Sequence, residues 1–357
     1  MKELKFQYPM ITSYQGIANT FAILQNVEAA QSWLFNNYIQ LVYYSNIDDV
    51  RLHEMTGSFY DLETGIKYVS LYNYCPYFKV QQIDRDTVKV FAKNIVDFLI
   101  NCINDNNYVS IYLNQFYIPN SSAYRKKQYD NSVIVFGYDK CREMLKTASF
   151  YRNTFSIEWM SFADVQKAFD NAFEKNEYTH KIVLLKLREN INYTFDTYEF
   201  IKYLADYISG KDHKSKFSFI RDKTYRYGID YYEGIKECFS SDNYDARLLH
   251  ILYDHKIVMS ERLKYFLRNN YINPISFNEL YKFNLDLSTK VKNVENLVLK
   301  NNYRYARFLP EDKKDVLANG EIFFQWPNYK KDDFIEKISE IKKLDIIFSQ
   351  RLTHEIK

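Results

Sequence analysis

The period of the hydrophobic pattern changes near Tyr193, and this change is the strongest constraint on the fold. Between about residues 105 and 190, short runs rich in β-branched and aromatic residues alternate with turn signals, which is typical of strands. These runs predict strands over residues 108–117, 132–138, 144–148, 155–159 and 181–187. After Tyr193 the apolar residues recur at helical spacing, which predicts helices over residues 197–208, 228–239, 245–268, 276–299 and 332–350. The sequence therefore predicts an α+β fold, with an α+β domain over residues 1–195 and an all-helical region over residues 196–357.

Helical spacing also occurs ahead of the strands, over residues 16–24, 29–41 and 86–102. Ser161 with Asp164, and Ser276 with Glu279, have the spacing of capping boxes and predict helix starts. In the long helix over residues 245–268, the predicted buried stripe consists of Leu249, Leu252, Met259, Leu263 and Phe266. Residues 47–80 are turn-rich and aromatic without a clear period, so no element is predicted there.

Composition excludes several classes of protein. Only 8 Gly occur in 357 residues, and they form neither of the phosphate-binding loops GxGxxG and GxxxxGK[ST], so no cofactor is expected. The six histidines contain no HExxH motif, and no metal site is expected. The four cysteines contain no CxxC pair, which favours reduced structural thiols at Cys75, Cys102, Cys141 and Cys238.

The charge pattern argues against two kinds of partner. The formal net charge is only +3, and no basic segment dominates, so no nucleic-acid partner is expected. No window approaches about 18 uncharged apolar residues, and residues 1–10 lack the apolar core of a signal peptide, so no membrane partner is expected. The expected compartment is the cytoplasm.

A set of short motifs, in a consistent order, carries a resemblance to a known family. The strand-like run SVIVFGYD follows Asn131, and it is preceded by PMITSY at residues 9–14, NNYIQL at 36–41, FYIP at 116–119 and Ala123-Tyr124. The chain thereby resembles the family named for the N-terminal domain of butirosin biosynthesis protein H. The resemblance continues to about residue 268 through Tyr227-Gly228-Ile229, Asp245, Arg247, Leu252, His255, Lys256, Met259 and Arg262-Leu263.

The resemblance implies a papain-like fold adapted to acyl transfer from a carrier-protein thioester to an amine. Such chemistry needs a thiolate, an imidazole and an orienting acid or amide. The family's triad positions fall on Tyr14, Asn131 and Ser149 in this sequence, with Ser13, Gln15 and Tyr138 as possible cleft neighbours. None of the three has the side chain that the triad requires, so catalysis by a Cys-His-Asp triad is not expected.

Each of these residues also has a structural interpretation. Asn131 either caps a turn at a strand edge or lines a surviving cleft, and Tyr14 either packs in the core or contacts a ligand. The charged residues between Asp245 and Met259 form either a solvated helix face or a surface for the first domain or a carrier protein. The run Arg125-Lys126-Lys127 is either a solvated loop or a contact for an acidic carrier.

The resemblance therefore gives two hypotheses. The first is a divergent acyltransferase-family protein of nonribosomal peptide or polyketide biosynthesis, whose partner is an acyl or peptidyl carrier protein. The alternative is a non-catalytic accessory or scaffold protein that docks on biosynthetic enzymes.

Overall fold

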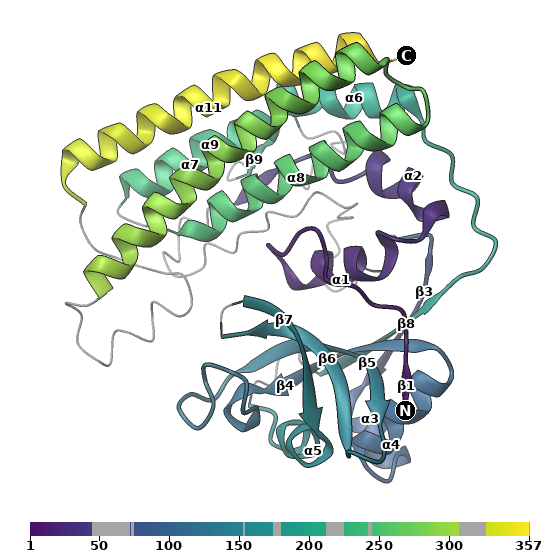
Figure 1. The fold of residues 1–357 in the computed structure, drawn as a ribbon. Helices are drawn as coiled ribbons and strands as arrows, with labels where there is room; N and C mark the ends of the chain where they lie inside the picture. Colours follow the sequence, from purple (N-terminus) through teal and green to yellow (C-terminus); the bar gives the residue numbers. More distant parts are fainter. Residues whose placement is uncertain are drawn as a thin grey trace. The chain divides into compact units, whose positions relative to one another are not determined.

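The computed structural model describes residues 1–44, 72, 75–152, 154–173, 180–211, 225–241, 245–306 and 326–356. Contacts group the chain into two compact units. The first unit comprises Met1–Ala29 and Thr64–Asn192, and the second comprises Ala30–Glu63 and Tyr193–Lys357. The first contains an antiparallel sheet with helices and the second is mainly helical, which confirms the predicted α+β class (Figure 1).

The sheet of the first unit is antiparallel. Its strands follow the order β3 (Phe78–Asp84), β8 (Lys181–Leu187), β4 (Asn107–Asn114), β5 (Asp130–Asp139), β6 (Met144–Tyr151) and β7 (Thr154–Ser161). The short strand β1 (Lys2–Glu3) pairs with the end of β5, next to a register shift between Val135 and Gly137. All five predicted strands are present in this sheet, and β1 and β3 are additions to them.

Side-chain capping explains two differences from the predicted elements. The predicted strand over residues 108–117 ends at Asn114, whose side chain accepts from Phe116 N and starts a short 3-10 helix, Gln115–Tyr117. The predicted helix over residues 86–102 consists of α3 (Arg85–Phe91) and α4 (Ile95–Asn104), because Asn94 caps α4 by accepting from Asp97 N at 2.7 Å. The predicted cap of α5 (Phe162–Asp170) is confirmed, since Ser161 Oγ accepts from Asp164 N.

One face of the sheet packs on helix α1 (Gln15–Leu24) and is called the α1 face. Cross-strand pairing places Ser110, Ile134 and Ala148 side by side. Tyr72 hydrogen-bonds both Ser110 and Asn19 of α1. The cross-strand set Ser110, Ile134 and Ala148 therefore belongs to the α1 face. Because alternate residues of a strand share a face, Ser132 also belongs to it.

The opposite face packs on α4 and α5 and is called the α4 face. Tyr138 pairs with Leu145, and its hydroxyl donates to Asn104 Oδ1 of α4 at 2.8 Å. Leu145, Thr147 and Ser149 alternate along β6, so they share this face. Figure 1 shows α1 on one side of the sheet and α3, α4 and α5 on the other.

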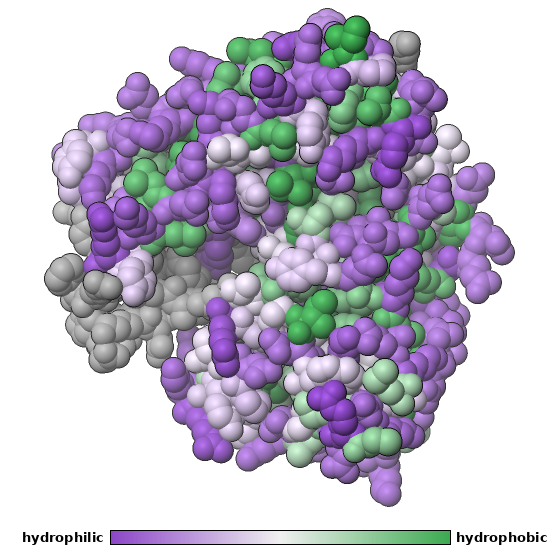
Figure 2. Space-filling model, in the orientation of Figure 1, coloured by the Kyte–Doolittle hydropathy of each residue, from purple (hydrophilic) through white to green (hydrophobic). Residues whose placement is uncertain are grey.

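The second unit is built from long helices. They are α6 (Thr197–Ile208), α7 (Tyr231–Ser240), α8 (Ala246–Arg268), α9 (Pro274–Ala306) and α11 (Asn328–Glu355), with most of α2 (Glu28–Asn36) and the two-stranded sheet of β2 (Val42–Tyr44) and β9 (Tyr225–Tyr227). Asp245 caps α8 by accepting from Arg247 N. On the surface of these helices that Figure 2 shows, hydrophilic side chains predominate and hydrophobic ones are scattered among them.

The N-terminal stretch Ala30–Glu63 belongs to the helical unit, whereas the predicted division places it in the first domain. Its apolar residues Phe35, Ile39, Leu41 and Tyr43 are buried in the helical core. The Gly228 N–H donates to Leu41 O at 2.7 Å, and Gly228 has φ 53, a conformation that favours glycine. A Cβ at Gly228 would lie 2.2 Å from Tyr207 O, so this junction requires glycine.

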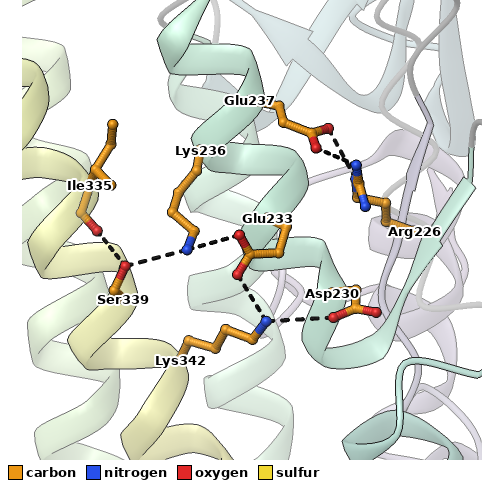
Figure 3. Close-up of polar contacts among 8 residues, drawn as sticks. All are labelled: Arg226, Asp230, Glu233, Lys236, Glu237, Ile335, Ser339 and Lys342. Atoms are coloured by element: carbon orange, nitrogen blue, oxygen red, sulfur yellow. Dashed lines mark hydrogen bonds and ion pairs between the residues drawn. The ribbon is translucent and has the colours of Figure 1, made fainter.

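Ion pairs join α7 to α11 at the surface of the second unit (Figure 3). Lys342 of α11 contacts Glu233 at 2.9 Å and Asp230 at 3.5 Å, and Lys236 contacts Glu233 at 2.8 Å. Lys236 also donates to Ser339 of α11 at 3.3 Å. Partial burial raises the pKa of Glu233, but hydrogen bonds from the two lysines outweigh burial and lower it below its usual value.

Candidate functional site

The family's nucleophile position lies where helix α1 begins. Tyr14 is extended, with φ −145° and ψ 136°, and Ala18 N donates to its carbonyl, so the helix starts at Gln15. The Tyr14 side chain is 46% exposed, which excludes the interpretation that it is packed in the core. Ile17 and Phe21 of this helix are buried. The contact of Gln15 with Ala148 O of β6 places the first turn beside the sheet.

A network of neutral polar side chains connects this first turn to the sheet. Gln15 Nε2 donates to Asn19 Oδ1 at 3.0 Å and to Ala148 O at 3.4 Å. Asn19 is fully buried, and its Nδ2 donates to Tyr72 Oη at 2.9 Å. Tyr72 also bonds Ser110, whose Oγ lies 3.2 Å from Ser132 Oγ. The α1 network is defined as Gln15, Asn19, Tyr72, Ser110 and Ser132.

The electrostatics of the α1 network are those of neutral groups. Burial raises the pKa of Tyr72 to about 12, although hydrogen bonds from Asn19 and Ser110 act in the opposite direction. The hydroxyl is therefore protonated near neutral pH and can donate as well as accept. Gln15 Oε1 is a buried acceptor with no hydrogen-bond partner among the described residues.

The two other triad positions point away from α1. Asn131 precedes Ser132 in β5 and lies on the α4 face, and its Oδ1 accepts from Ser132 N at 2.9 Å. Ser149 is fully buried on the same face, and its Oγ donates to Ser132 O at 2.6 Å. The structure therefore does not bring the side chains of Tyr14, Asn131 and Ser149 together, because strand alternation turns two of them to the opposite side of the sheet.

The predicted cleft neighbours also separate. Tyr138 lies on the α4 face and bonds Asn104, whereas Gln15 is a member of the α1 network. Ser13 is half-buried just before the helix. Sequence reasoning did not find Asn19, Tyr72, Ser110 and Ser132; a buried Asn within a helix pattern, and serines in runs of β-branched residues, were the available signals.

Two of the described cysteines do not offer an activated thiolate. Cys102 of α4 and Cys238 of α7 are buried, and burial raises the pKa of each thiol to about 12. Cys141 is exposed in the turn after β5. Cys75 is 2% exposed, and its N–H donates to Tyr72 O at 3.2 Å, so its backbone adjoins the α1 network. His53, a histidine within the predicted first domain, lies outside the described residues.

Most charged residues between Asp245 and Met259 are buried, so the interpretation of this segment as a solvated face is wrong for them. Asp245, Asp254, His255, Lys256 and Arg262 are each at most 2% exposed, so they are neither a solvated face nor a surface open to a carrier protein. His255 instead bonds Ile39 O, and Ile39 lies within the first domain as the sequence predicted it. Only Arg247 and His250 keep partial exposure.

Arg262 caps the C-terminus of α2 from inside the second unit. Its guanidinium donates to the carbonyls of Phe35, Asn37 and Tyr38 at 2.8, 2.8 and 3.1 Å. A cation at this end of a helix complements the helix dipole and the unpaired carbonyls. Complete burial lowers the pKa of Arg262 to about 9. In the first unit, by contrast, Arg125, Lys126 and Lys127 are exposed, and docking of an acidic carrier there stays a prediction.

Comparison with protein-family models and with curated proteins gave no match to this chain. Within the described ranges, no group of three or more His, Cys, Asp and Glu side chains could hold a metal ion. No helix among the described residues combines the length and apolar character of a membrane span.

Proposed function

We propose that the first unit is a divergent papain-like, acyltransferase-family module that binds a carrier-bound acyl or peptidyl group without attacking it, in a cytoplasmic pathway of specialised metabolism. The observation that carries the proposal is the contact of Gln15 with Asn19 and with the Ala148 carbonyl. It joins the first turn of α1 to β6, which pairs with the SVIVFGYD strand. The resemblance implies a nucleophile position at the start of this helix, so the contact supports the proposal, although the side chains of Tyr14, Asn131 and Ser149 do not meet.

The chemistry of the α1 network suits binding better than covalent catalysis. Amide and hydroxyl groups can donate to a thioester or amide carbonyl and accept from an amide N–H. An amide is not a general base near neutral pH, and the Tyr72 phenol keeps its proton there. The unpartnered acceptor Gln15 Oε1 would bond an amide N–H of the pantetheine arm or of a peptidyl group.

The alternative, a non-catalytic accessory or scaffold protein, is favoured by a different observation. Asn19 is fully buried and bonded inside the unit, as expected if the polar groups hold α1 on the sheet. In that case Gln15 contributes to stability and binds no acyl group.

A matched pair of variants separates these functions. Gln15→Leu removes the amide of the α1 network, whereas Tyr138→Phe removes a hydroxyl that bonds Asn104 on the α4 face. Acetyl- and aminoacyl-pantetheine thioesters serve as probes, and calorimetry measures their affinity. Loss of one hydrogen bond should weaken binding by Gln15→Leu about 5- to 10-fold, and Tyr138→Phe should match the wild type.

Melting curves of the same proteins complete the test. The binding proposal requires that Gln15→Leu lose affinity while its melting temperature changes little. Equal affinity of both variants, together with a lower melting temperature for Gln15→Leu, would overturn the binding proposal and favour the scaffold. Iodoacetamide should leave thioester binding intact; loss of binding that tracks alkylation of Cys75 would instead indicate a thiol centre.

A further inference from the structure

Three helices of the second unit each carry a buried seam with alternating spacings of three and four residues. In α9 the seam is Leu280, Asn284, Leu287, Val291, Val294 and Val298, and in α11 it is Phe334, Ile338, Ile341, Asp345, Phe348 and Leu352. In α8 it is Leu249, Leu252, Lys256, Met259, Leu263 and Phe266. This is heptad spacing, which is typical of helices that pack side by side. Each seam contains one polar residue in an otherwise hydrophobic series.

The three polar residues lie at one level of the bundle. Contacts between α9 and α11 fix their antiparallel register, since Glu279 pairs with Arg351 and Lys290 pairs with Glu340. This register places Asn284 opposite the segment between Asp345 and Ser349 of α11. Asn284 also donates to Lys256 O of α8 at 2.7 Å. The polar layer is defined as Lys256, Asn284, Asp345 and Ser349, all fully buried.

One oxygen of Asp345 is heavily used. Lys256 Nζ, Tyr207 Oη and Tyr232 Oη all donate to Asp345 Oδ2, at 2.5, 2.6 and 2.9 Å. Lys256 Nζ also lies 3.1 Å from His255 Nδ1, while His255 Nε2 lies 2.8 Å from Ile39 O. A carbonyl only accepts, so Nε2 carries the proton and Nδ1 accepts from Lys256. On the side of Asp345 Oδ2, the Lys256–Asp345 ion pair is thus surrounded by hydrogen-bonding partners.

The other side of the layer has unused hydrogen-bonding atoms. Asp345 Oδ1, Asn284 Oδ1 and Ser349 Oγ are buried and have no hydrogen-bond partner among the described residues. Asp345 and Ser349 are one helical turn apart on α11, so their side chains are neighbours. A buried polar atom without a partner costs about 1–3 kcal/mol. Three such atoms at one level of a well-packed bundle indicate a shared partner.

We infer that the polar layer is a binding site for one internal water molecule, which donates to Asp345 Oδ1 and Asn284 Oδ1 and bonds Ser349 Oγ. Two acceptors and one hydroxyl match the two to four polar partners that buried waters have. The Lys256 ammonium already neutralises the Asp345 carboxylate, so a neutral donor fits the layer better than a second cation. The water completes a polar layer that reaches from α6 and α7 through α8 to α9 and α11.

Ser349→Ala tests the site because the two possibilities predict opposite signs. If the water is present, the variant loses a bond to it, and the full-length protein should melt about 2 °C lower than the wild type or more. If Ser349 Oγ has no partner, removal of an unsatisfied hydroxyl leaves the melting temperature unchanged or raises it, which would overturn the inference. Ser288→Ala is the matched control, because this buried hydroxyl already bonds Leu285 O in its own helix.

Two further measurements identify the occupant. A high-resolution crystal structure of the full chain should show solvent density within hydrogen-bond distance of Asp345 Oδ1 and Ser349 Oγ. Direct bonding of these atoms to protein groups would overturn the inference. Melting in ammonium chloride and in sodium chloride at equal concentration should give the same result. A melting temperature that rises with ammonium in the wild type, but not in Ser349→Ala, would identify a cation and reject water.

Discussion

The two units bury polar groups in different ways. The α1 network consists of neutral amides and hydroxyls, begins at a half-buried glutamine and lies beside the exposed Tyr14. The polar layer of the second unit contains a lysine and an aspartate that are completely buried. Exchanging the hydrogen-bond partner of a neutral group for a ligand changes the free energy little. Removing the partner of a buried charge costs a large free energy.

This difference assigns the two regions different tasks. The α1 network can exchange an internal hydrogen bond for one to a ligand, which suits a binding site. The polar layer sits in three heptad seams, where a polar residue fits only opposite another polar residue, so it can fix the register of the helices. Substitutions in the two regions should therefore differ in size and in the part of the protein that they affect.

The largest effect is expected from Asp345→Ala. It leaves the Lys256 ammonium and the hydroxyls of Tyr207 and Tyr232 without their acceptor inside the core. Breaking a buried ion pair in this way costs about 3–5 kcal/mol, so we expect a large loss in the free energy of unfolding. Chemical denaturation followed by circular dichroism at the helix signal measures it.

A quadruple variant sharpens the same prediction. Lys256→Met, Asp345→Leu, Tyr207→Phe and Tyr232→Phe together remove every charged or hydroxyl group that meets at Asp345 Oδ2. Its free energy of unfolding should recover most of the loss, because an apolar replacement of a whole buried pair is often neutral or stabilising. If the quadruple variant is less stable than Asp345→Ala, the ion pair itself contributes net stability and the comparison between the regions fails.

A smaller effect is expected from Tyr72→Phe in the α1 network. The variant removes the hydroxyl that accepts from Asn19 and bonds Ser110, which should cost about 1–2 kcal/mol. Hydrogen exchange of individual amides should speed up in α1 and β4, while amides of α8 and α9 should keep their wild-type rates. Tyr198→Phe, at an 81% exposed tyrosine, is the control. Faster exchange in the helical unit as well would contradict a network confined to the first unit.

Periodicity and capping signals predicted much of the fold. Strand β8 and helix α6 have the predicted bounds, because an apolar run and the helical spacing of apolar residues are local signals. The break between α3 and α4 was missed because apolar spacing continues across Asn94. The membership of residues 30–44 in the helical unit depends on carbonyl contacts with Arg262, more than 200 residues away, and local patterns carry no such information.

The candidate site was harder to predict than the fold. A resemblance aligns sequence positions, but a shift of one residue in a strand turns a side chain to the other face, as Asn131 and Ser132 illustrate. The predicted stripe of α8 skipped Lys256 because a charged residue is rarely buried without a partner. Its partner Asp345 lies 89 residues away. Only the heptad spacing of α9 and α11, each interrupted by one polar residue, could have indicated that Lys256 has a buried partner.

The smallest effect is expected from a change of pH. It acts through the partly exposed ion pair between His250 of α8 and Glu295 of α9. Burial lowers the pKa of His250. The hydrogen bond that its Nδ1 donates to Glu295 Oε1 at 3.1 Å and the charges of Asp254 and Glu295 outweigh burial and the nearby Lys292 charge, so the pKa is raised above 6.5. A raised folded-state pKa means that this stabilisation is complete below 6.5 and is lost as pH rises through the folded value.

Because His250 is partly exposed, the expected loss above that pH is only about 0.5 kcal/mol. It should be visible in urea denaturation at closely spaced pH values between about 6 and 8.5. The control His250→Gln removes the titrating group and should make stability flat over this range. A wild-type protein that becomes more stable as pH rises through the same interval would contradict the prediction, because it would show that burial and the Lys292 charge outweigh the two carboxylates and lower the folded-state pKa of His250.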